Sequence, residues 1–312
     1  MRALVIGAAG FVGQYLIQHL QEQGDEVFGT SIDGRVPGLS SGQGVALDIT
    51  AQSSCGDVIQ RVRPEVVYHL AGISFVPEAE ADFARTLAVN VGGTANVVRH
   101  CHLLNQGVAV LFVSSAEVYG QVPVHALPVG EETELRPTNN YSLSKRMAEL
   151  VVERYGRMGS LRYTIARPFN HIGPGQDQRF VASNFAYQLA SIALKRSAPV
   201  LEVGNLEARR DFSDVRDIVK AYRRIAESGV GVYNLGSGVP RSIQSLLDTL
   251  IAVSGLQVEV RQDPARMRGP EVLELYSSYE KAWRECGWRP SIRFEQSLED
   301  IYRFWYDKLS RE

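Results

Sequence analysis

The sequence predicts an α/β fold, a doubly wound parallel sheet with a smaller C-terminal lobe interleaved with it. Short apolar runs rich in Val, Ile and Leu alternate with longer segments of helical period along the first half of the 312-residue chain. The runs are apolar on both faces, as the strands of a sheet covered by helices must be. The repeated order of strand and helix indicates the doubly wound arrangement.

The expected elements alternate regularly up to Pro168. We expect strands at residues 2–7, 26–31, 65–72, 108–115 and 162–168, and helices at 11–24, 53–63, 81–104 and 139–159. Beyond them come loops rich in Gly, Asn and charge at 169–178, 204–212 and 262–272, with a helix near 180–196. A helix at 213–228 leads to a strand at 232–236, which we expect to return to the main sheet. The predicted division is therefore 1–168 plus about 212–236 for the sheet domain, and 169–211 with 237–312 for the lobe.

The composition argues against several classes of function. The net charge is -2 and the pI is near 6.3, without runs of Lys and Arg interleaved with aromatics, so we expect no nucleic-acid partner. Cys55, Cys101 and Cys286 lack CxxC spacing, so neither a metal site nor a disulfide is predicted. The N-terminus has no signal-peptide pattern and no stretch is long and apolar enough to span a membrane. We therefore expect a soluble, cytoplasmic protein.

Gly7, Gly10 and Gly13 form a GxxGxxG pattern directly after the first strand and at the start of a helix. The first glycine permits a tight turn, the second lets a pyrophosphate approach the backbone, and the third lets helix and strand pack closely. A glycine-rich turn with a purely structural role is the alternative. The strand-turn-helix context favours a Rossmann dinucleotide-binding domain, and hence a nicotinamide cofactor.

The end of the second strand bears on which nicotinamide cofactor is bound. An NAD-binding domain usually carries an acid there, which bonds the ribose hydroxyls. This chain has Thr30 and Ser31 at that point, and Asp33 follows slightly later. Arg35 could pair with a 2′-phosphate, so NADP(H) is favoured, while NAD(H) with Asp33 as ribose ligand stays open. Asp48 could accept a hydrogen bond from the adenine amino group or cap the next helix.

A catalytic set is predicted from the stretch YSLSK and the serine before it. Tyr141 and Lys145 are four residues apart at the start of a helix, so they lie on one face and reach the same ligand. A tyrosine with a pKa near 10 needs a nearby cation to act as an acid-base catalyst at neutral pH, and Lys145 can supply it. Ser115, at a strand end, can hold the substrate oxygen that Tyr141 protonates.

With these residues the chain resembles the extended short-chain dehydrogenase/reductase family over essentially its whole length. The Ser/Tyr/Lys triad of that family maps onto Ser115, Tyr141 and Lys145. The stretches ARPFNHIGPGQ, LEVGNLEARRDFSDVRDIVKAY and DPARMRGPE look like its GDP-sugar branch, which contains the GDP-mannose 4,6-dehydratases and the GDP-4-dehydro-6-deoxymannose reductases. GISFVPEA and FNHIGPGQ look more like the reductases.

The resemblance implies how the lobe holds a nucleotide sugar. Asn170 would lie near the diphosphate, Arg210 and Arg268 near phosphate or ribose, and Glu271 on the base, while Arg209 would be a surface neighbour. The expected substrate contacts are Ser74, Phe75, Glu117, Asn170, Val181, Arg210, Arg268 and Glu271. The expected cofactor contacts are Gly7, Gly10, Phe11, Val12, Gly13, Ser31, Asp33, Arg35, Asp48, Ile49, Leu70, Ala71, Gly72, Asn90, Tyr141, Lys145 and Pro168.

Glu117 separates two chemistries within this branch. In the resembled dehydratases a serine or aspartate follows the catalytic Ser or Thr, and a glutamate base comes next. Here the order is Ser115, Ala116, Glu117, so the base is present and the donor is missing. We therefore expect an NAD(P)H-dependent reduction of the C4 ketone of GDP-4-dehydro-6-deoxy-D-mannose to a GDP-6-deoxyhexose, GDP-D-rhamnose. A GDP-mannose 4,6-dehydratase, a sugar-nucleotide 4-epimerase and a non-enzymatic NADP-binding sensor are the alternatives.

The resemblance also implies a homodimer. Related enzymes pack two helices from each subunit into a four-helix bundle, and the corresponding segments here are 83–104 and 140–158.

Overall fold

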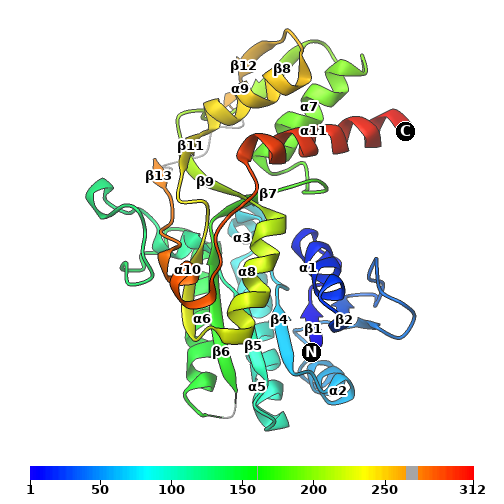
Figure 1. Ribbon diagram of the computed structural model, residues 1–312, viewed down its shortest axis with the longest axis vertical. Helices are drawn as coiled ribbons and strands as arrows, with labels where there is room; N and C mark the ends of the chain where they lie inside the picture. Colours follow the sequence, from blue (N-terminus) through cyan, green and yellow to red (C-terminus); the bar gives the residue numbers. More distant parts are fainter. Residues whose placement is uncertain (160, 265–272) are drawn as a thin grey trace.

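The computed structural model of the chain describes residues 1–159, 161–264 and 273–312. Its main sheet has seven parallel strands in the order β10-β6-β5-β4-β1-β2-β3 (Figure 1). The strands are β1 Arg2–Ile6, β2 Glu26–Ser31, β3 Gly44–Ala46, β4 Val66–His69, β5 Ala109–Val113, β6 Arg162–Pro168 and β10 Gly231–Leu235. From β1 the chain winds outward in both directions, so the predicted doubly wound parallel sheet is confirmed.

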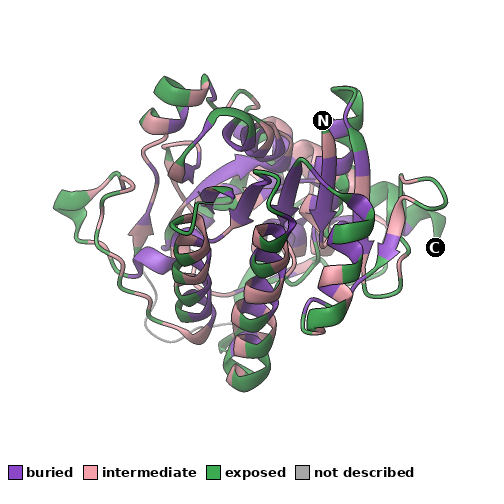
Figure 2. Cartoon of the chain, turned by 90° about the horizontal axis from the view of Figure 1, so that it is seen from below, coloured by how far each residue is buried: buried purple, intermediate pink, exposed green. Residues whose placement is uncertain are grey.

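Helices cover both faces of the main sheet. One face packs against α1 and α8, and the other against α2, α5 and α6. Their bounds are α1 Phe11–Glu22, α2 Gln52–Val62, α5 Thr94–Leu104, α6 Asn140–Gly156 and α8 Val215–Ser228. Ala3 and Val5 belong to the first apolar cluster and Leu4 and Ile6 to the second, so β1 is buried on both faces. Figure 2 shows the buried residues concentrated in the strands and the exposed ones on the outer sides of the helices.

A smaller lobe with its own apolar core lies beyond the carboxyl ends of the main strands (Figure 1). Its helices are α7 Val181–Ala193, α9 Ile243–Ser254 and α11 Phe294–Arg311. Its small sheets contain β7 Asn170–Ile172, β8 Val200–Val203, β9 Arg209–Asp214, β11 Pro240–Ser242, β12 Glu259–Gln262 and β13 Glu274–Leu275. The strand expected at 232–236 does return to the main sheet, where β10 pairs with β6.

The helix predicted at 81–104 is one helical stretch with an irregular centre. It comprises α4 (Phe83–Leu87), the π-helical turn η1 (Ala88–Gly93) and α5, and the short α3 (Val76–Ala81) precedes it. The remaining short helices are η2 Ala116–Tyr119, η3 Val124–Ala126 and α10 Glu280–Cys286. Within the described ranges, no helix is both long and apolar enough to cross a membrane.

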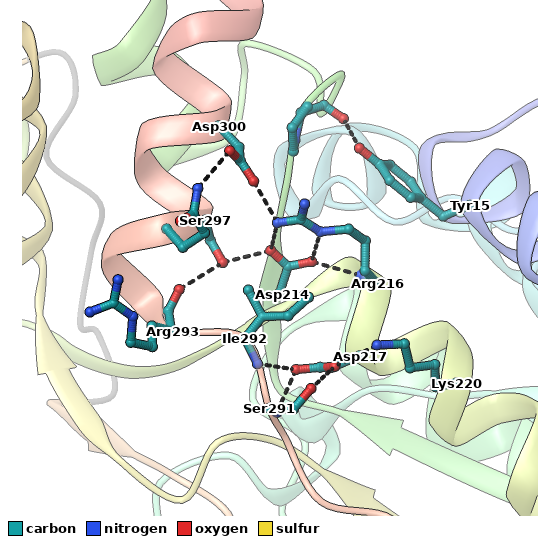
Figure 3. Close-up of polar contacts among 12 residues, drawn as sticks. Tyr15, Asp214, Arg216, Asp217, Lys220, Ser291, Ile292, Arg293, Ser297 and Asp300 are labelled. Carbon is teal, nitrogen blue, oxygen red and sulfur yellow. Dashed lines mark hydrogen bonds and ion pairs between the residues drawn. The ribbon is translucent and has the colours of Figure 1, made fainter.

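Ionic contacts fix α11 of the lobe to α8 of the sheet domain (Figure 3). Asp214 caps α8 by accepting from the Arg216 N–H, and its carboxylate also accepts two bonds from the Arg216 guanidinium. Arg216 reaches Asp300 on α11 at 2.8 Å, and Ser297 on α11 donates to Asp214. The side chain of Asp214 is fully buried, so these bonds form a buried link between the lobe and α8.

Candidate active site

The glycine-rich turn after β1 has the geometry expected for a dinucleotide. Gly7 has a φ of +88°, and a Cβ there would lie 2.8 Å from the Ala71 nitrogen. A Cβ on Gly13 would lie 2.5 Å from the Ala8 carbonyl oxygen, so helix and strand approach more closely than a side chain allows. Gly10 is the N-cap of α1, and no side chain caps this end of the helix with a hydrogen bond. Free N–H groups at a helix start suit a pyrophosphate.

The loop after β4 lies between this turn and α6. The backbone N–H groups of Leu70 and Ala71 donate to the Ile6 carbonyl at 2.9 Å. A Cβ on Gly72 would lie 2.9 Å from the Asn90 amide oxygen and 3.5 Å from the Lys145 ammonium nitrogen. The expected cofactor contacts from β1, β4, η1 and α6 therefore meet at one edge of the sheet.

Asn90 holds the loop after β4 from the π-helical turn. Its side-chain oxygen accepts from the Ile73 N–H at 2.8 Å, and its amide nitrogen donates to the Ile73 carbonyl and the Ser144 hydroxyl. The side chain is 2% exposed. Asn90 therefore shapes the loop that carries Gly72, in addition to lying beside the expected cofactor.

The end of β2 is followed by a candidate residue for each cofactor alternative, Asp33 and Arg35, whose charged groups lie 3.9 Å apart. The Asp33 carboxylate accepts from the Ser31 hydroxyl at 2.9 Å and the Arg35 N–H at 3.0 Å. The Arg35 backbone bond, with a smaller contribution from Ser31, lowers the pKa of Asp33. The Arg35 side chain is 91% exposed, and a groove lined by Arg35, Ser40 and Ser41 lies beside it. Either an acid for a ribose or a cation for a phosphate is available here.

Asp48 and Ile49 lie at the entrance to α2. Asp48 accepts from the N–H and hydroxyl of Thr50, whereas the N-cap of α2 is Ala51, so the alternative role of Asp48 as the cap of this helix is wrong. The Asp48 carboxylate accepts from the N–H two residues later and so closes a turn before the helix begins. Ile49 is buried against η1, where a Cβ on Gly93 would approach it to 2.5 Å.

The structure brings the predicted triad together at the carboxyl end of β5. Ser115 follows the strand, and its hydroxyl accepts from the Glu117 N–H at 3.2 Å. Tyr141 is 8% exposed, and burial raises its pKa to about 12. A hydrogen bond from Ser115 opposes this rise in the pKa of Tyr141, and the charge of Glu117 adds to it. The Tyr141 phenol is therefore protonated at neutral pH and lies against the serine hydroxyl.

Lys145 lies one turn along α6 from Tyr141. Its ammonium group donates to the Val113 carbonyl at 2.9 Å and lies 5.2 Å from the centre of the Phe112 ring. Burial lowers the pKa of Lys145 to about 8, and the charge of Glu149 opposes that decrease.

Glu117 faces the start of α6. Its carboxylate accepts from the Asn139 amide at 3.4 Å, and Asn139 is also the N-cap of α6 in a capping box with Ser142. The residue before it, Ala116, is 5% exposed and carries no donor. The carboxylate is thus within range of Tyr141 and is tied to the helix that carries it.

The expected substrate residues near α3 and α7 meet across the two lobes. Ser74 is exposed. The Phe75 ring packs edge-to-face on the ring of Phe180, with 6.0 Å between the ring centres. Phe180 directly precedes Val181 in the sequence. The Arg179 guanidinium lies 4.7 Å from the centre of the Phe75 ring. This contact joins the loop after β4 to the start of α7.

The remaining substrate residues lie on the small sheet of the lobe. Asn170 is exposed at the start of β7, which pairs with β9, and β9 carries Arg210. Arg209 is half-exposed and ion-paired with Glu274, as expected for a surface neighbour. The predicted ligands Arg268 and Glu271 fall outside the described residues, and Pro168 is buried at the end of β6.

Sequence reasoning missed two buried carboxylates beside the predicted ligands. Asp211 follows Arg210 and accepts from the N–H and hydroxyl of both Ser237 and Ser277, and from the Gly238 N–H. Glu149, four residues after Lys145, is the other. The sequence signal that could have found them is their position, one residue after Arg210 and four residues after Lys145. Across residues 1–159, 161–264 and 273–312, no group of His, Cys, Asp and Glu could hold a metal ion.

Known proteins match the chain over its whole length. A profile of the family described as GDP-mannose 4,6 dehydratase matches residues 4–301. GDP-6-deoxy-D-mannose reductase of Pseudomonas aeruginosa is 36% identical over 100% of this chain and 99% of its own. The structure of RMD from Pseudomonas aeruginosa complexed with NADPH has a TM-score of 0.88 at 35% identity, covering 99% of this chain and 100% of that one. The UDP-glucose 4-epimerase of Thermus thermophilus, in complex with NAD, has a TM-score of 0.84 at 26% identity, covering 98% and 99%. With a dinucleotide turn, a clustered Ser/Tyr/Lys set and this full-length match, the chain belongs to the GDP-mannose 4,6 dehydratase family.

Proposed function

We propose that the protein reduces the C4 ketone of GDP-4-dehydro-6-deoxy-D-mannose with NAD(P)H, giving GDP-D-rhamnose. The observation that carries the proposal is the pairing of Ser115 with Tyr141 beside a buried Ala116, where a dehydratase would keep a second donor. The likeness to a GDP-6-deoxy-D-mannose reductase, at 36% identity over the full chain, supports it.

The chain's own residues would divide the work of a reduction. A bound nicotinamide supplies the hydride that adds to the carbonyl carbon. The Ser115 hydroxyl holds the carbonyl oxygen, and Tyr141 gives its proton to that oxygen as negative charge develops. Because the pKa of Tyr141 is raised to about 12, the tyrosine holds its proton until the acceptor is present. Lys145, in reach of the loop after β4, orients the cofactor ribose.

We propose that NADP(H) is the preferred cofactor. Gly7, Gly10 and Gly13 would hold the pyrophosphate, and the exposed Arg35 would pair with the 2′-phosphate. The related RMD carries NADPH, which supports this choice. NAD(H), with Asp33 on the ribose, stays the alternative, and the Thermus epimerase carries NAD.

The substrate would lie between the two lobes. We propose that residues 169–211 and 237–312 form the nucleotide-sugar lobe, with Asn170, Arg210, Arg268 and Glu271 as ligands. The Rossmann domain would comprise 1–168 and about 212–236. The ionic contacts between α8 and α11 support a fixed position of the lobe relative to the Rossmann domain.

We propose a cytoplasmic homodimer built on 83–104 and 140–158. On the outer side of α6, Leu143, Met147 and Leu150 are exposed at helical spacing, and Leu103 is exposed on neighbouring α5. Apolar side chains at i, i+4 and i+7 form one stripe, as a four-helix bundle requires. Light scattering should give twice the 34.5 kDa mass of the chain, and a monomer would refute the dimer.

The decisive experiment is to add the protein to the keto sugar with each reduced cofactor. We expect loss of nicotinamide absorbance and a product whose C4 configuration, by NMR, is that of GDP-D-rhamnose. No cofactor consumption would refute the reductase. Release of keto sugar from GDP-mannose without net reduction would identify a dehydratase that uses Glu117 as base. An isomerised sugar without net redox change would identify an epimerase, and cofactor binding without turnover of any sugar a sensor.

Tyr141→Phe tests the triad. Removing the hydroxyl takes away the proton donor, so we expect kcat to fall at least ~100-fold. Cofactor binding, measured by fluorescence, should be unchanged. Tyr155→Phe on the same helix is the matched control. Retained activity in Tyr141→Phe would discard the assignment.

A further inference from the structure

Glu149 is a fully buried carboxylate one helical turn after Lys145. One of its oxygens accepts from the Ser114 hydroxyl at 2.6 Å and from Nε of Arg167 at 2.8 Å. The other accepts from Nη2 of Arg167 at 2.8 Å and Nη1 of Arg146 at 2.9 Å. Four hydrogen-bond donors, three of them from the cations Arg146 and Arg167, therefore surround this carboxylate in the core.

These bonds join the two segments that carry the proposed catalytic residues, the end of β5 and α6, and link both to β6. Ser114 directly precedes Ser115 at the end of β5, and Arg167 lies near the end of β6. Glu149 itself lies on α6, with Tyr141 and Lys145. One carboxylate thus ties the serine to the helix that holds the tyrosine and lysine.

Stability alone does not explain a buried ion pair between Glu149 and Arg167. Apolar side chains of similar volume often hold a core equally well, and a buried ion pair carries a large desolvation penalty. What apolar residues could not provide is negative charge beside Lys145. Lys145 is 5% exposed, and its ammonium group donates a hydrogen bond to the Val113 backbone carbonyl.

The other ionisable groups around Lys145 supply no such charge. On β4, burial and then the charge of Lys145 lower the pKa of His69 to about 3, so that imidazole is neutral. Tyr141 on α6 is neutral because burial raises its pKa. Arg167 on β6 is a cation. Among the described residues, Glu149 is the one whose charge raises the pKa of Lys145.

We propose that Glu149 is a positioning residue for the triad, which keeps Lys145 protonated and holds the strand end of Ser115 against α6. The inference rests on the proposed reductase function for its effect on turnover, but its electrostatic part concerns the protein alone. A reduction needs Lys145 cationic, to orient the cofactor and to stabilise the tyrosinate left after proton transfer.

Two substitutions should move Lys145 in opposite directions. Glu149→Gln keeps the shape and removes the anion, leaving Arg167 as an unbalanced cation, so Lys145 should lose its proton at lower pH. Arg167→Gln removes the cation, while Ser114 and Arg146 still hold the carboxylate, so Lys145 should lose its proton at higher pH. A purely structural tie predicts no such opposition.

The titration of Lys145 can be followed by NMR of ¹³Cε-labelled lysine. The chain has five lysines, and Lys145→Arg identifies the signal. We expect the midpoint of Lys145 to fall by about one pH unit or more in Glu149→Gln and to rise in Arg167→Gln. Ser114→Ala removes a neutral donor and leaves the charges of Glu149, Arg146 and Arg167 in place, so it should shift the midpoint much less than either of the other two substitutions.

The pH dependence of kcat should shift in the same directions as the titration of Lys145. With the keto sugar, the alkaline fall in kcat should begin at lower pH in Glu149→Gln and at higher pH in Arg167→Gln. An unchanged midpoint in folded Glu149→Gln, or shifts of both variants in one direction, would overturn the proposal. If Glu149→Gln does not fold, Arg167→Gln alone decides by its sign. The NMR titration needs no substrate, so failure of the keto-sugar reaction in wild type would refute the reductase and leave this test intact.

Discussion

Replacing Lys145 by Met should stabilise the protein while removing its activity. Burial lowers the pKa of Lys145 from its ordinary value of 10.5 to about 8. At roughly 1.4 kcal/mol per pH unit, holding the buried lysine charged at pH 7 costs about 3 kcal/mol of folding free energy. Methionine has a similar length and no charge, so Lys145→Met relieves this cost. Loss of the bond to the Val113 carbonyl offsets part of the gain.

The pH dependence isolates the contribution of the charge. The folded-state pKa of Lys145 lies below its unfolded value, so between about pH 8 and 10.5 the unfolded chain binds more protons. The wild-type free energy of unfolding therefore gains a contribution that rises through this window, and Lys145→Met lacks it. From pH 7 to 10.5, the free energy of unfolding of wild type should therefore rise by about 3 kcal/mol relative to that of Lys145→Met.

Urea unfolding followed by tryptophan fluorescence measures this difference at each pH. Tyrosines and other groups that titrate in both proteins cancel in the comparison. Lys195→Met, at an exposed lysine, is the control and should give a difference that does not change with pH. If the difference for Lys145→Met is also constant from pH 7 to 10.5, the buried, strained charge inferred for Lys145 is refuted.

Two further predictions concern packing and the lobe. Gly13→Ala would place a Cβ 2.5 Å from the Ala8 carbonyl oxygen, so we expect about 2 kcal/mol lower stability and weaker NADPH binding by fluorescence titration. Gly130→Ala, in open space, is its control, and equal effects would contradict the close packing. Arg216→Ala leaves the buried Asp214 without its cation and should cost about 3 kcal/mol in thermal unfolding. Arg303→Ala, in an exposed pair, should change it by less than ~1 kcal/mol.

The sequence was sufficient for the main sheet because its strands carry their own signal. Their runs of Val, Ile and Leu must be covered on both sides, and only a sheet between two helical layers does this. The strands of the lobe carry no such signal. All four residues of β12 are exposed, and the strand exists because its backbone pairs with β8, more than fifty residues earlier. Pairing of this kind cannot be read from local pattern.

The site divides in the same way. Tyr141 and Lys145 could be predicted because their spacing is local and their chemistry is distinctive. Glu149 has the same four-residue spacing from Lys145, but an acid on a helix normally faces solvent, and only the fold buries it against β5 and β6. Asp211 was missed for the same reason, since its donors come from segments 26 and 66 residues away.

The π-helical turn at η1 has a consequence for how this protein can change. A regular helix advances about 100° per residue, and a π turn holds one residue more than the α-helix needs. That extra residue lets Asn90 face Ile73 while Val97 and Val98, further along, still face the sheet. Losing or gaining a single residue in this segment would rotate one of these two surfaces away from its partner. The length of the segment between α4 and α5 is therefore constrained by two contacts at once.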